Sequence, residues 1–140
     1  MKKLLSITVI FVALIITSCA SDKKDDPLAP TSTSDVRDKF VSYWSAIENS
    51  AVIGTPTSHT VNIIKSTTTS SEILINNFSG LSVSARAIVN SNLITIPYQQ
   101  VGSIGFTQGT GTLTNANTIS LTYTTTISGS RDSSSTVYSK

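Results

Sequence analysis

The chain has 140 residues, of which 13% are charged, and its formal net charge at pH 7 is +2. So small a positive charge gives no surplus of basic groups to bind phosphates, which argues against a nucleic-acid partner. The single cysteine excludes an intramolecular disulfide, and one histidine without a cysteine in the folded domain excludes a structural zinc site.

Residues 1–18 have the pattern of a signal peptide. Two lysines supply a positive start, and an apolar run from Leu4 through Ile16 follows, interrupted by two hydroxyl residues. This run is shorter than the roughly 20 apolar residues that a transmembrane helix needs, so we expect cleavage. Loss of the two lysines leaves eight basic and eight acidic residues, and the formal net charge of the mature chain is then zero.

The apolar run ends in a cysteine motif. Ile16-Thr17-Ser18-Cys19 resembles the bacterial lipobox, which is cut before the cysteine after the thiol receives diacylglycerol. The resemblance implies cleavage between Ser18 and Cys19 and a covalent lipid on Cys19; we expect no other cofactor. Several acyl chains would give lasting membrane attachment. The alternatives are an ordinary secretory peptide with a chance cysteine, or an N-terminal anchor helix.

Residues 19–34 follow as the lipidated cysteine and a tether. Charge, two prolines and many Ser and Thr residues leave almost nothing to bury, which predicts a disordered linker. Within it, Lys24-Asp25-Asp26 resembles the lipoprotein export signal of Bacteroidetes, in which a lysine precedes two acidic residues. The resemblance implies lipid attachment to the outer membrane, facing the cell surface. A periplasm-facing location is the alternative.

Residues 35–140 are long enough for one domain with a modest core. Ser and Thr make up about a third of the whole chain, and Gly, Asn and Ser interrupt the apolar pattern at short intervals, which is typical of all-β proteins. At the start, Asp35 can cap a short helical turn that runs through Phe40.

After this turn, alternating apolar and polar residues predict about eight short strands. The candidates, in chain order, are Val41–Asn49, His59–Lys65, Glu72–Phe78, Leu81–Val89, Asn92–Pro97, Ser103–Thr114, Thr118–Thr126 and Ser133–Tyr138. Short connections join only antiparallel neighbours, so we expect an up-and-down meander. Closure into a barrel would remove two exposed edges, and an open β-sandwich is the alternative.

The chain also resembles small Bacteroidetes surface lipoproteins with a lipocalin-like meander barrel. Trp44 stands where lipocalins place the Trp of a Gly-x-Trp motif, with Ser42 in the position of the glycine. The segments that carry the resemblance are the lipobox, Lys24-Asp25-Asp26, Arg37–Val41, Asn92–Pro97, Gly109–Leu113 and Tyr138-Ser139-Lys140. The resemblance implies a lipocalin-like barrel but no activity.

Few residues offer catalytic chemistry. His59 is the only histidine and follows Pro56-Thr57-Ser58, so we expect it at an exposed edge next to a turn. Two carboxylates such as Glu48 and Glu72 are what a glycosidase pair requires, but they lie on different predicted strands and nothing in the sequence brings them together. We therefore predict no catalytic residues, no metal site and no enzyme.

The aromatic residues are the remaining candidates for a site. Trp44, Tyr43, Phe106 and Tyr123 can line a ligand cavity or fill the core, as can Phe78, Tyr98 and Tyr138. Aromatic residues of small β domains usually belong to the core, and an eight-stranded barrel either is filled or holds one small ligand. The apolar residues that the strands turn inward favour a filled barrel.

These observations predict a non-enzymatic, membrane-anchored lipoprotein that acts as a binding or accessory module. Its partner would be a protein, a glycan or a small apolar ligand. One alternative is a lipocalin-type carrier, which would hold a small apolar ligand inside the barrel, and another is a hydrolytic enzyme. A cavity beside Trp44 would favour the carrier.

Overall fold

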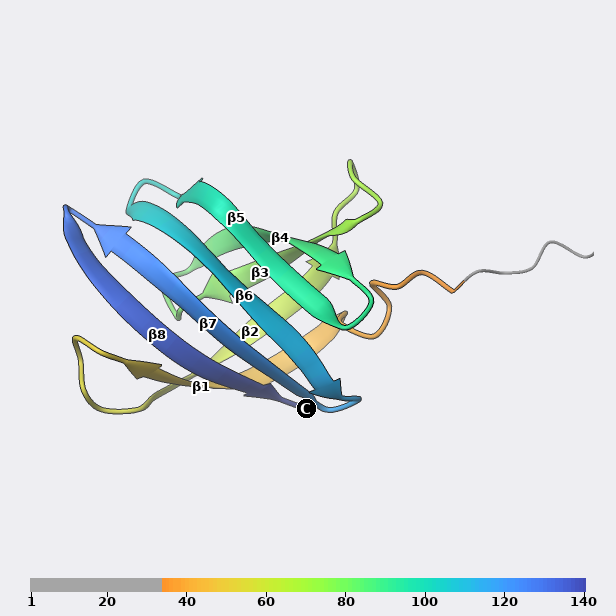
Figure 1. The fold of residues 1–140 in the computed structure, drawn as a ribbon, viewed down its shortest axis with the longest axis horizontal. Helices are drawn as coiled ribbons and strands as arrows, with labels where there is room; N and C mark the ends of the chain where they lie inside the picture. The colour runs from red at the N-terminus through yellow and green to blue at the C-terminus, as the bar shows by residue number, and fades with distance from the viewer. Residues whose placement is uncertain (1–33) are drawn as a thin grey trace, which may run out of the picture. The chain divides into compact units, whose positions relative to one another are not determined.

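A computed structural model describes residues 34–140, which form an eight-stranded antiparallel barrel (Figure 1). The strands are β1 (Ser42–Ser50), β2 (Thr57–Lys65), β3 (Glu72–Phe78), β4 (Val83–Asn90), β5 (Leu93–Val101), β6 (Gly105–Asn115), β7 (Thr118–Ile127) and β8 (Ser130–Ser139). Each strand pairs with the next along the chain, and β1 pairs with β8 to close the barrel. The predicted strand number, order and closure are confirmed, and the open sandwich is wrong.

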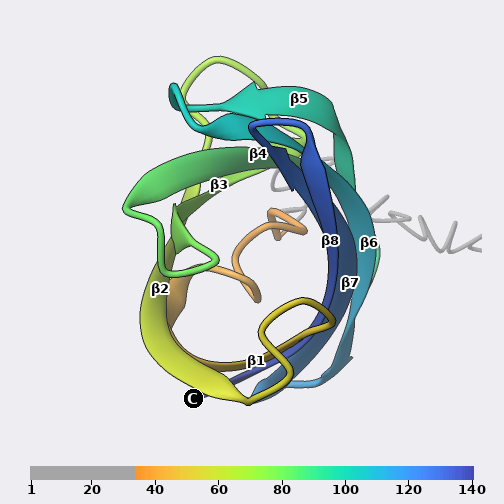
Figure 2. The same ribbon diagram turned by 90° about the vertical axis from the view of Figure 1, so that its left-hand side faces the viewer.

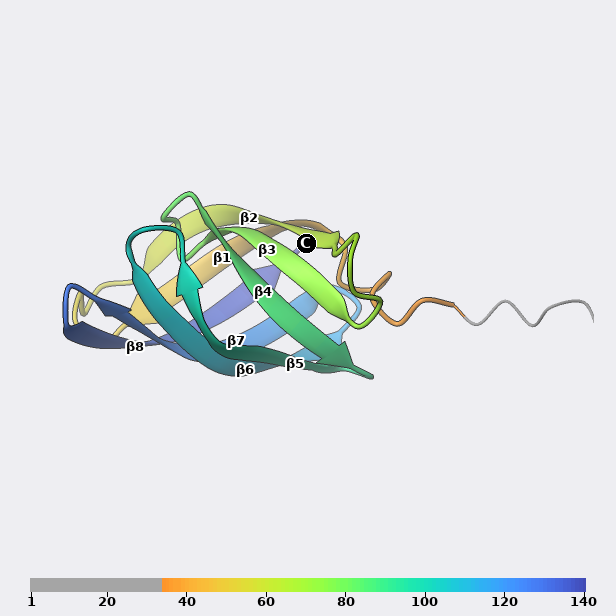
Figure 3. The same cartoon turned by 90° about the horizontal axis from the view of Figure 1, so that it is seen from above.

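The barrel wall is continuous. Figure 1 shows β5–β8 side by side, and Figure 3 shows β2, β3 and β4 next to one another on another side. Closure rests on six residue pairs from Ser45 opposite Ser139 to Ser50 opposite Ser134. Because both edge strands are paired with each other, the backbone presents no open sheet edge in the described part of the chain.

The two ends of the barrel differ. The connections β1–β2, β3–β4, β5–β6 and β7–β8 meet at one end, which we call the mouth (Figure 1). The segment before β1 closes the opposite end, which we call the plugged end. In Figure 2, which looks into the mouth, this segment lies within the ring of strands. Any opening for a ligand is therefore expected at the mouth.

Residues 36–40 form hydrogen-bonded turns and no helix, so the predicted short helical turn is present as turns only. The amides of Asp38 and Phe40 donate to carbonyl oxygens three residues earlier, at 2.9 and 3.0 Å. The predicted cap is present, since the Asp35 carboxylate accepts from the Arg37 amide at 2.9 Å. Among residues 34–140 no helix is long and apolar enough to cross a bilayer.

Arg37 fastens this segment to the barrel. Its guanidinium binds Asp35 at 2.7 Å and donates to the carbonyl oxygens of Ser66 and Thr69, each at 3.0 Å, in the β2–β3 connection. Lys65 adds an ion pair with Asp35 at 3.1 Å. These bonds hold the residues that precede Phe40 against the plugged end.

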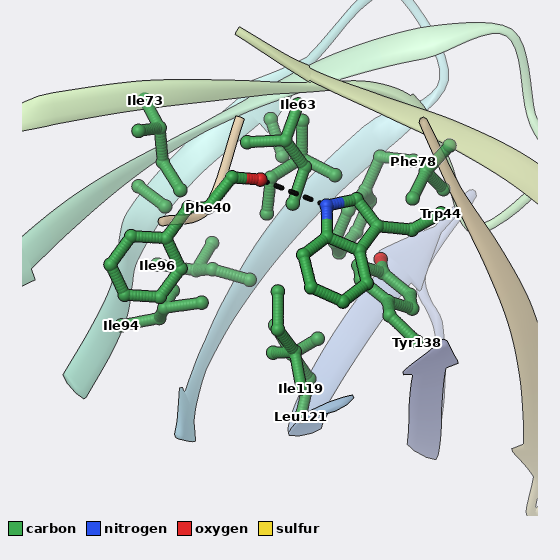
Figure 4. Packing of buried hydrophobic residues seen from close by; sticks show 14 of the residues in the cluster. Phe40, Trp44, Ile63, Ile73, Phe78, Ile94, Ile96, Ile119, Leu121 and Tyr138 are labelled. Atoms are coloured by element: carbon green, nitrogen blue, oxygen red, sulfur yellow. Dashed lines mark hydrogen bonds between the residues drawn. The ribbon is translucent and has the colours of Figure 1, made fainter. Parts of the chain in front are cut away.

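A buried apolar core occupies the barrel interior, and Figure 4 shows part of it. Trp44 is fully buried, and its indole N–H donates to the Phe40 carbonyl oxygen at 2.8 Å. The Lys140 ammonium lies 4.3 Å from the centre of the Trp44 ring, within the range of a cation–π contact. The prediction that Trp44 belongs to the core is confirmed. The aromatic rings of Phe40 and Trp44 are surrounded by Ile63, Ile73, Ile94, Ile96 and Ile119.

Strand β5 continues beyond its predicted end. The sequence stops it at Pro97, whereas the structure extends it to Val101 through an irregularity between Ile96 and Gln99. Proline has no N–H for the ladder, so the pairing with β6 shifts around it and then resumes. On β6 a Cβ at Gly109 would lie 2.4 Å from the Thr122 carbonyl oxygen, so only glycine permits this approach to β7.

Candidate functional site

The inward side chains change from apolar to polar along four neighbouring strands. From the plugged end to the mouth, the inward side chains of β1 are Trp44, Ala46, Glu48 and Ser50; those of β2 are Ile63, Val61, His59 and Thr57; those of β7 are Ile119, Leu121, Tyr123 and Thr125; and those of β8 are Tyr138, Thr136 and Ser134. Because β7, β8, β1 and β2 are contiguous in the wall, these polar groups form one layer at the mouth.

Glu48 is the central group of this layer. Glu48 is 4% exposed, and its Oε1 accepts hydrogen bonds from the Ser79 and Ser134 hydroxyls, both at 2.9 Å. Its Oε2 is buried without a hydrogen-bond partner. A buried acceptor left unpaired costs about 1–3 kcal/mol, more when charged. A donor supplied from outside the chain would therefore stabilise this oxygen.

His59 lies beside this free oxygen. Its Nε2 is 3.9 Å from Glu48 Oε2, which is too far for a hydrogen bond, and it also lacks a partner. The side chain is only 11% exposed, so the expectation of an exposed edge position is wrong. The reason is register: His59 pairs with Ala46 and shares the inward face of Val61 and Ile63.

A bulge brings Ser79 to the site. The pairing of β3 with β4 shifts between Asn76 and Phe78, and Asn77 takes a left-handed φ of 59°. Its side chain donates to the Thr60 carbonyl oxygen at 2.7 Å, which fixes the bulge. Gly80 then turns with φ of +69°, and a Cβ there would lie 3.3 Å from the His59 ring. Glycine thus permits the loop to pass close to His59.

Several hydroxyls complete the layer. The Tyr123, Tyr138, Thr125 and Thr136 hydroxyl oxygens are buried without partners. Burial, followed by the nearby Glu48 carboxylate, raises the pKa of Tyr123 above its ordinary value of 10.0. Burial also raises the pKa of Tyr138, and Tyr123 and Glu48 add to the shift. Both phenols therefore keep their protons at neutral pH and are available as hydrogen-bond donors.

A pocket of about 360 Å³ opens on this layer, and we call it the mouth pocket. Its polar floor includes Glu48, His59 and Ser79, and its rim includes Ile53, Leu81 and Ile127. A volume near the low end of the range for ligand sites suits a small molecule. In the described part of the chain, its charged lining residues are the acids Glu48 and Asp132, with no Lys or Arg.

Two of the predicted aromatic candidates lie outside the barrel. Tyr43 is 70% exposed, and Phe106 stacks on Tyr98 with ring centroids 5.2 Å apart on the outer surface. The prediction that they fill the core or line an internal cavity is wrong, because each is out of phase with the inward residues of its strand. Tyr123 does lie inside, against Phe78 with centroids 4.5 Å apart.

A wider hollow of about 900 Å³ lies over strands β5–β8 and β1. Outward Ser, Thr, Asn and Gln residues supply much of its lining, including Asn49, Gln108, Thr122 and Ser135. We call it the outer groove. The outward side chains of this wall are exposed, so water can satisfy their polar groups. The groove therefore gives less reason to expect a bound ligand than the mouth pocket, whose buried polar groups lack partners.

The acids and the histidine do not form the arrangements that were weighed for catalysis. Glu48 points into the mouth, whereas Glu72 lies on the outer face and pairs with Arg86 near the plugged end, so they make no glycosidase pair. In a Ser–His–acid triad the serine donates to the histidine, but Ser79 donates to Glu48. Within residues 34–140 no group of three His, Cys, Asp or Glu side chains is placed to hold a metal.

The other predicted site residues lie outside the described residues. These are the signal cleavage site at Ser18 and Cys19, the lipid on Cys19, and the export motif Lys24-Asp25-Asp26. They remain predictions from the sequence.

No protein-family model matches the chain, and no curated protein matches it. Among solved structures, one that is similar is a redesigned β-barrel, with 9% sequence identity and a TM-score of 0.52. The match covers 79% of this chain and 98% of that one. At this identity the likeness supports the barrel fold alone.

Proposed function

We propose that this protein is a non-enzymatic, lipid-anchored module at the outer membrane that binds a small ligand in the mouth pocket. The proposal rests on two buried polar atoms that lack hydrogen-bond partners. Glu48 Oε2 and His59 Nε2 face each other across 3.9 Å, and neither has a partner. One polar group of a ligand, or a water, that approaches both atoms from the same side would satisfy them.

The filled half of the barrel limits the ligand. Trp44, Phe40 and Tyr138 occupy the interior below the mouth, each fully buried. A long apolar molecule would have to displace this core. The proposal therefore does not include the lipocalin-type carrier, which would hold an apolar ligand inside the barrel. The ligand is instead short and enters only the polar layer at the mouth.

The anchor belongs to the proposal because of the sequence that precedes the barrel. Ile16-Thr17-Ser18-Cys19 supports lipidation, and Lys24-Asp25-Asp26 supports display on the cell surface. A tether of about 15 residues after Cys19 would separate the barrel from the membrane and leave the mouth accessible.

Blocking the mouth tests the binding. Thr57 lines the mouth pocket and pairs with Glu48, so Thr57→Trp would fill the pocket with an indole ring. Thr60, on the outer face of the same strand, gives the matched control Thr60→Trp. Ligand-observed NMR with a mixture of small amines, alcohols, acids and sugars is the assay, using the full-length protein in maltoside detergent.

We expect some of these compounds to bind the wild type and the Thr60→Trp variant, and none to bind the Thr57→Trp variant. Far-UV circular dichroism would show that both variants keep the barrel. Equal binding by the two tryptophan variants would refute a ligand site at the mouth.

A further inference from the structure

The charge of the mouth pocket defines its ligand more narrowly, on the premise that this pocket is the binding site. Two carboxylates line it, and no Lys or Arg does so in the described part of the chain. Asp132 is fully engaged, since it accepts from the Ser50 hydroxyl at 2.6 Å and from the Val52 amide at 3.1 Å. Glu48, which lines the same pocket, keeps one carboxylate oxygen that is buried and has no hydrogen-bond partner.

The groups around that oxygen favour a donor that carries positive charge. A buried carboxylate is costly unless it is paired, and the two serine hydroxyls serve only its other oxygen. Charge-assisted hydrogen bonds are about twice as strong as neutral ones, so an ammonium group would satisfy Glu48 Oε2 better than a hydroxyl would. An anion would meet two carboxylates and no fixed cation.

The rim of the pocket adds an apolar requirement. Ile53 is 59% exposed, Leu81 41% and Ile127 38%, and all three line the same pocket. They come from or border three different connections at the mouth, so they surround the opening. Large apolar side chains left exposed together around an opening are typical of a binding site.

We infer that the mouth pocket binds a small amphipathic amine. Its ammonium group donates to Glu48 Oε2 beside His59, and its apolar body packs against Ile53, Leu81 and Ile127. The Thr125 hydroxyl, which lacks a partner in a residue that lines the same pocket, is available for a further polar group of the ligand.

Three ligands that share one ring test the inference. Cyclohexylamine, cyclohexanol and cyclohexanecarboxylate are titrated at pH 7, where an alkylamine is protonated, into the full-length protein in maltoside detergent. Methyl NMR signals of Ile53, Leu81 and Ile127 report binding at the mouth. We expect the amine to bind at least about tenfold more tightly than the alcohol, and the carboxylate to bind most weakly.

Two matched variants test whether the Glu48 carboxylate is the charge that binds the amine. Glu48→Gln keeps the shape and the hydrogen bonds to the serines, and it should weaken amine binding at least about tenfold and remove the preference over the alcohol. Glu72→Gln removes a buried carboxylate on the outer face, and amine binding should be unchanged. If Glu48→Gln fails to fold, the comparison of the three ligands on the wild type still decides.

The outcomes separate this inference from the proposed function. Mouth binding of the alcohol or the carboxylate as tight as that of the amine would overturn the amine assignment and leave a ligand site in place. Methyl signals that respond to none of the three ligands would also overturn the assignment. The Thr57→Trp comparison then decides independently whether the mouth binds small molecules at all.

Discussion

Replacement of Trp44 should remove much of the stability of the barrel. A Trp side chain buries about 150–250 Å², which at about 25 cal/mol per Å² corresponds to roughly 4–6 kcal/mol. Trp44 is fully buried, and its loss also leaves the Phe40 carbonyl oxygen without its 2.8 Å hydrogen bond. Measured truncations of large core aromatics cost about 3–5 kcal/mol, which we expect for Trp44→Ala. Since domains are stable by only about 5–15 kcal/mol, this is a large fraction.

Urea unfolding of the full-length protein, followed by far-UV circular dichroism, is the assay. Trp44→Phe keeps an aromatic ring but loses the N–H, and should cost about 1–3 kcal/mol. Tyr43→Ala is the matched control on the outer face of the same strand, and its effect should stay within about 0.5 kcal/mol because Tyr43 is 70% exposed. Wild-type fluorescence should be blue-shifted. Equal losses at positions 43 and 44, or red-shifted emission, would refute the assignment of Trp44 to the core.

Three further predictions concern the N-terminal part of the chain. Cys19→Ala should abolish labelling by an alkyne fatty acid, and retained label would contradict lipidation at Cys19. Replacement of Lys24-Asp25-Asp26 by alanines should keep the lipid but protect the barrel from protease added to whole cells, whereas equal digestion would remove the motif from the account. Hydrogen bonds from Arg37 lower the pKa of Asp35 below its ordinary 3.8. The charged form therefore stabilises the fold above about pH 4, and this contribution is lost as the pH falls further. Asp35→Asn should flatten the acid dependence of the melting temperature between about pH 5 and 2, and an unchanged slope would contradict this.

The period of two along each strand predicted the fold well because one face of every strand is buried. The same period contains the signal for the site. Glu48 is in phase with Trp44 on β1, and His59 is in phase with Val61 on β2, so alternation alone places both side chains inside. The expectation of an exposed edge position for His59 rests on the rule that polar residues near a turn are usually exposed. Tyr43 is out of phase with Trp44, and its exposed position follows from the same rule.

Other features depend on contacts between distant residues. The sequence does not specify that Ala46 pairs with His59, and this register sets the distance between His59 and Glu48. The bulge at Asn77, which carries Ser79 to the Glu48 carboxylate, depends on a side-chain bond to β2. A polar cluster whose members come from five strands and connections cannot be assembled from local periodicity.

Since the polar layer lies at the mouth and the core lies below it, one barrel combines two tasks. The plugged half provides stability through Phe40 and Trp44. The mouth half keeps Glu48 and His59 buried but unpaired, at a cost that a bound ligand would offset. Binding should therefore raise the melting temperature of the whole domain.

A crystal structure of the protein with cyclohexylamine is the most direct test of the account. We predict density for the ring between Ile53, Leu81 and Ile127, with the ammonium nitrogen about 2.7–2.9 Å from Glu48 Oε2. Only water in the mouth pocket, or ligand density in the outer groove, would contradict the account.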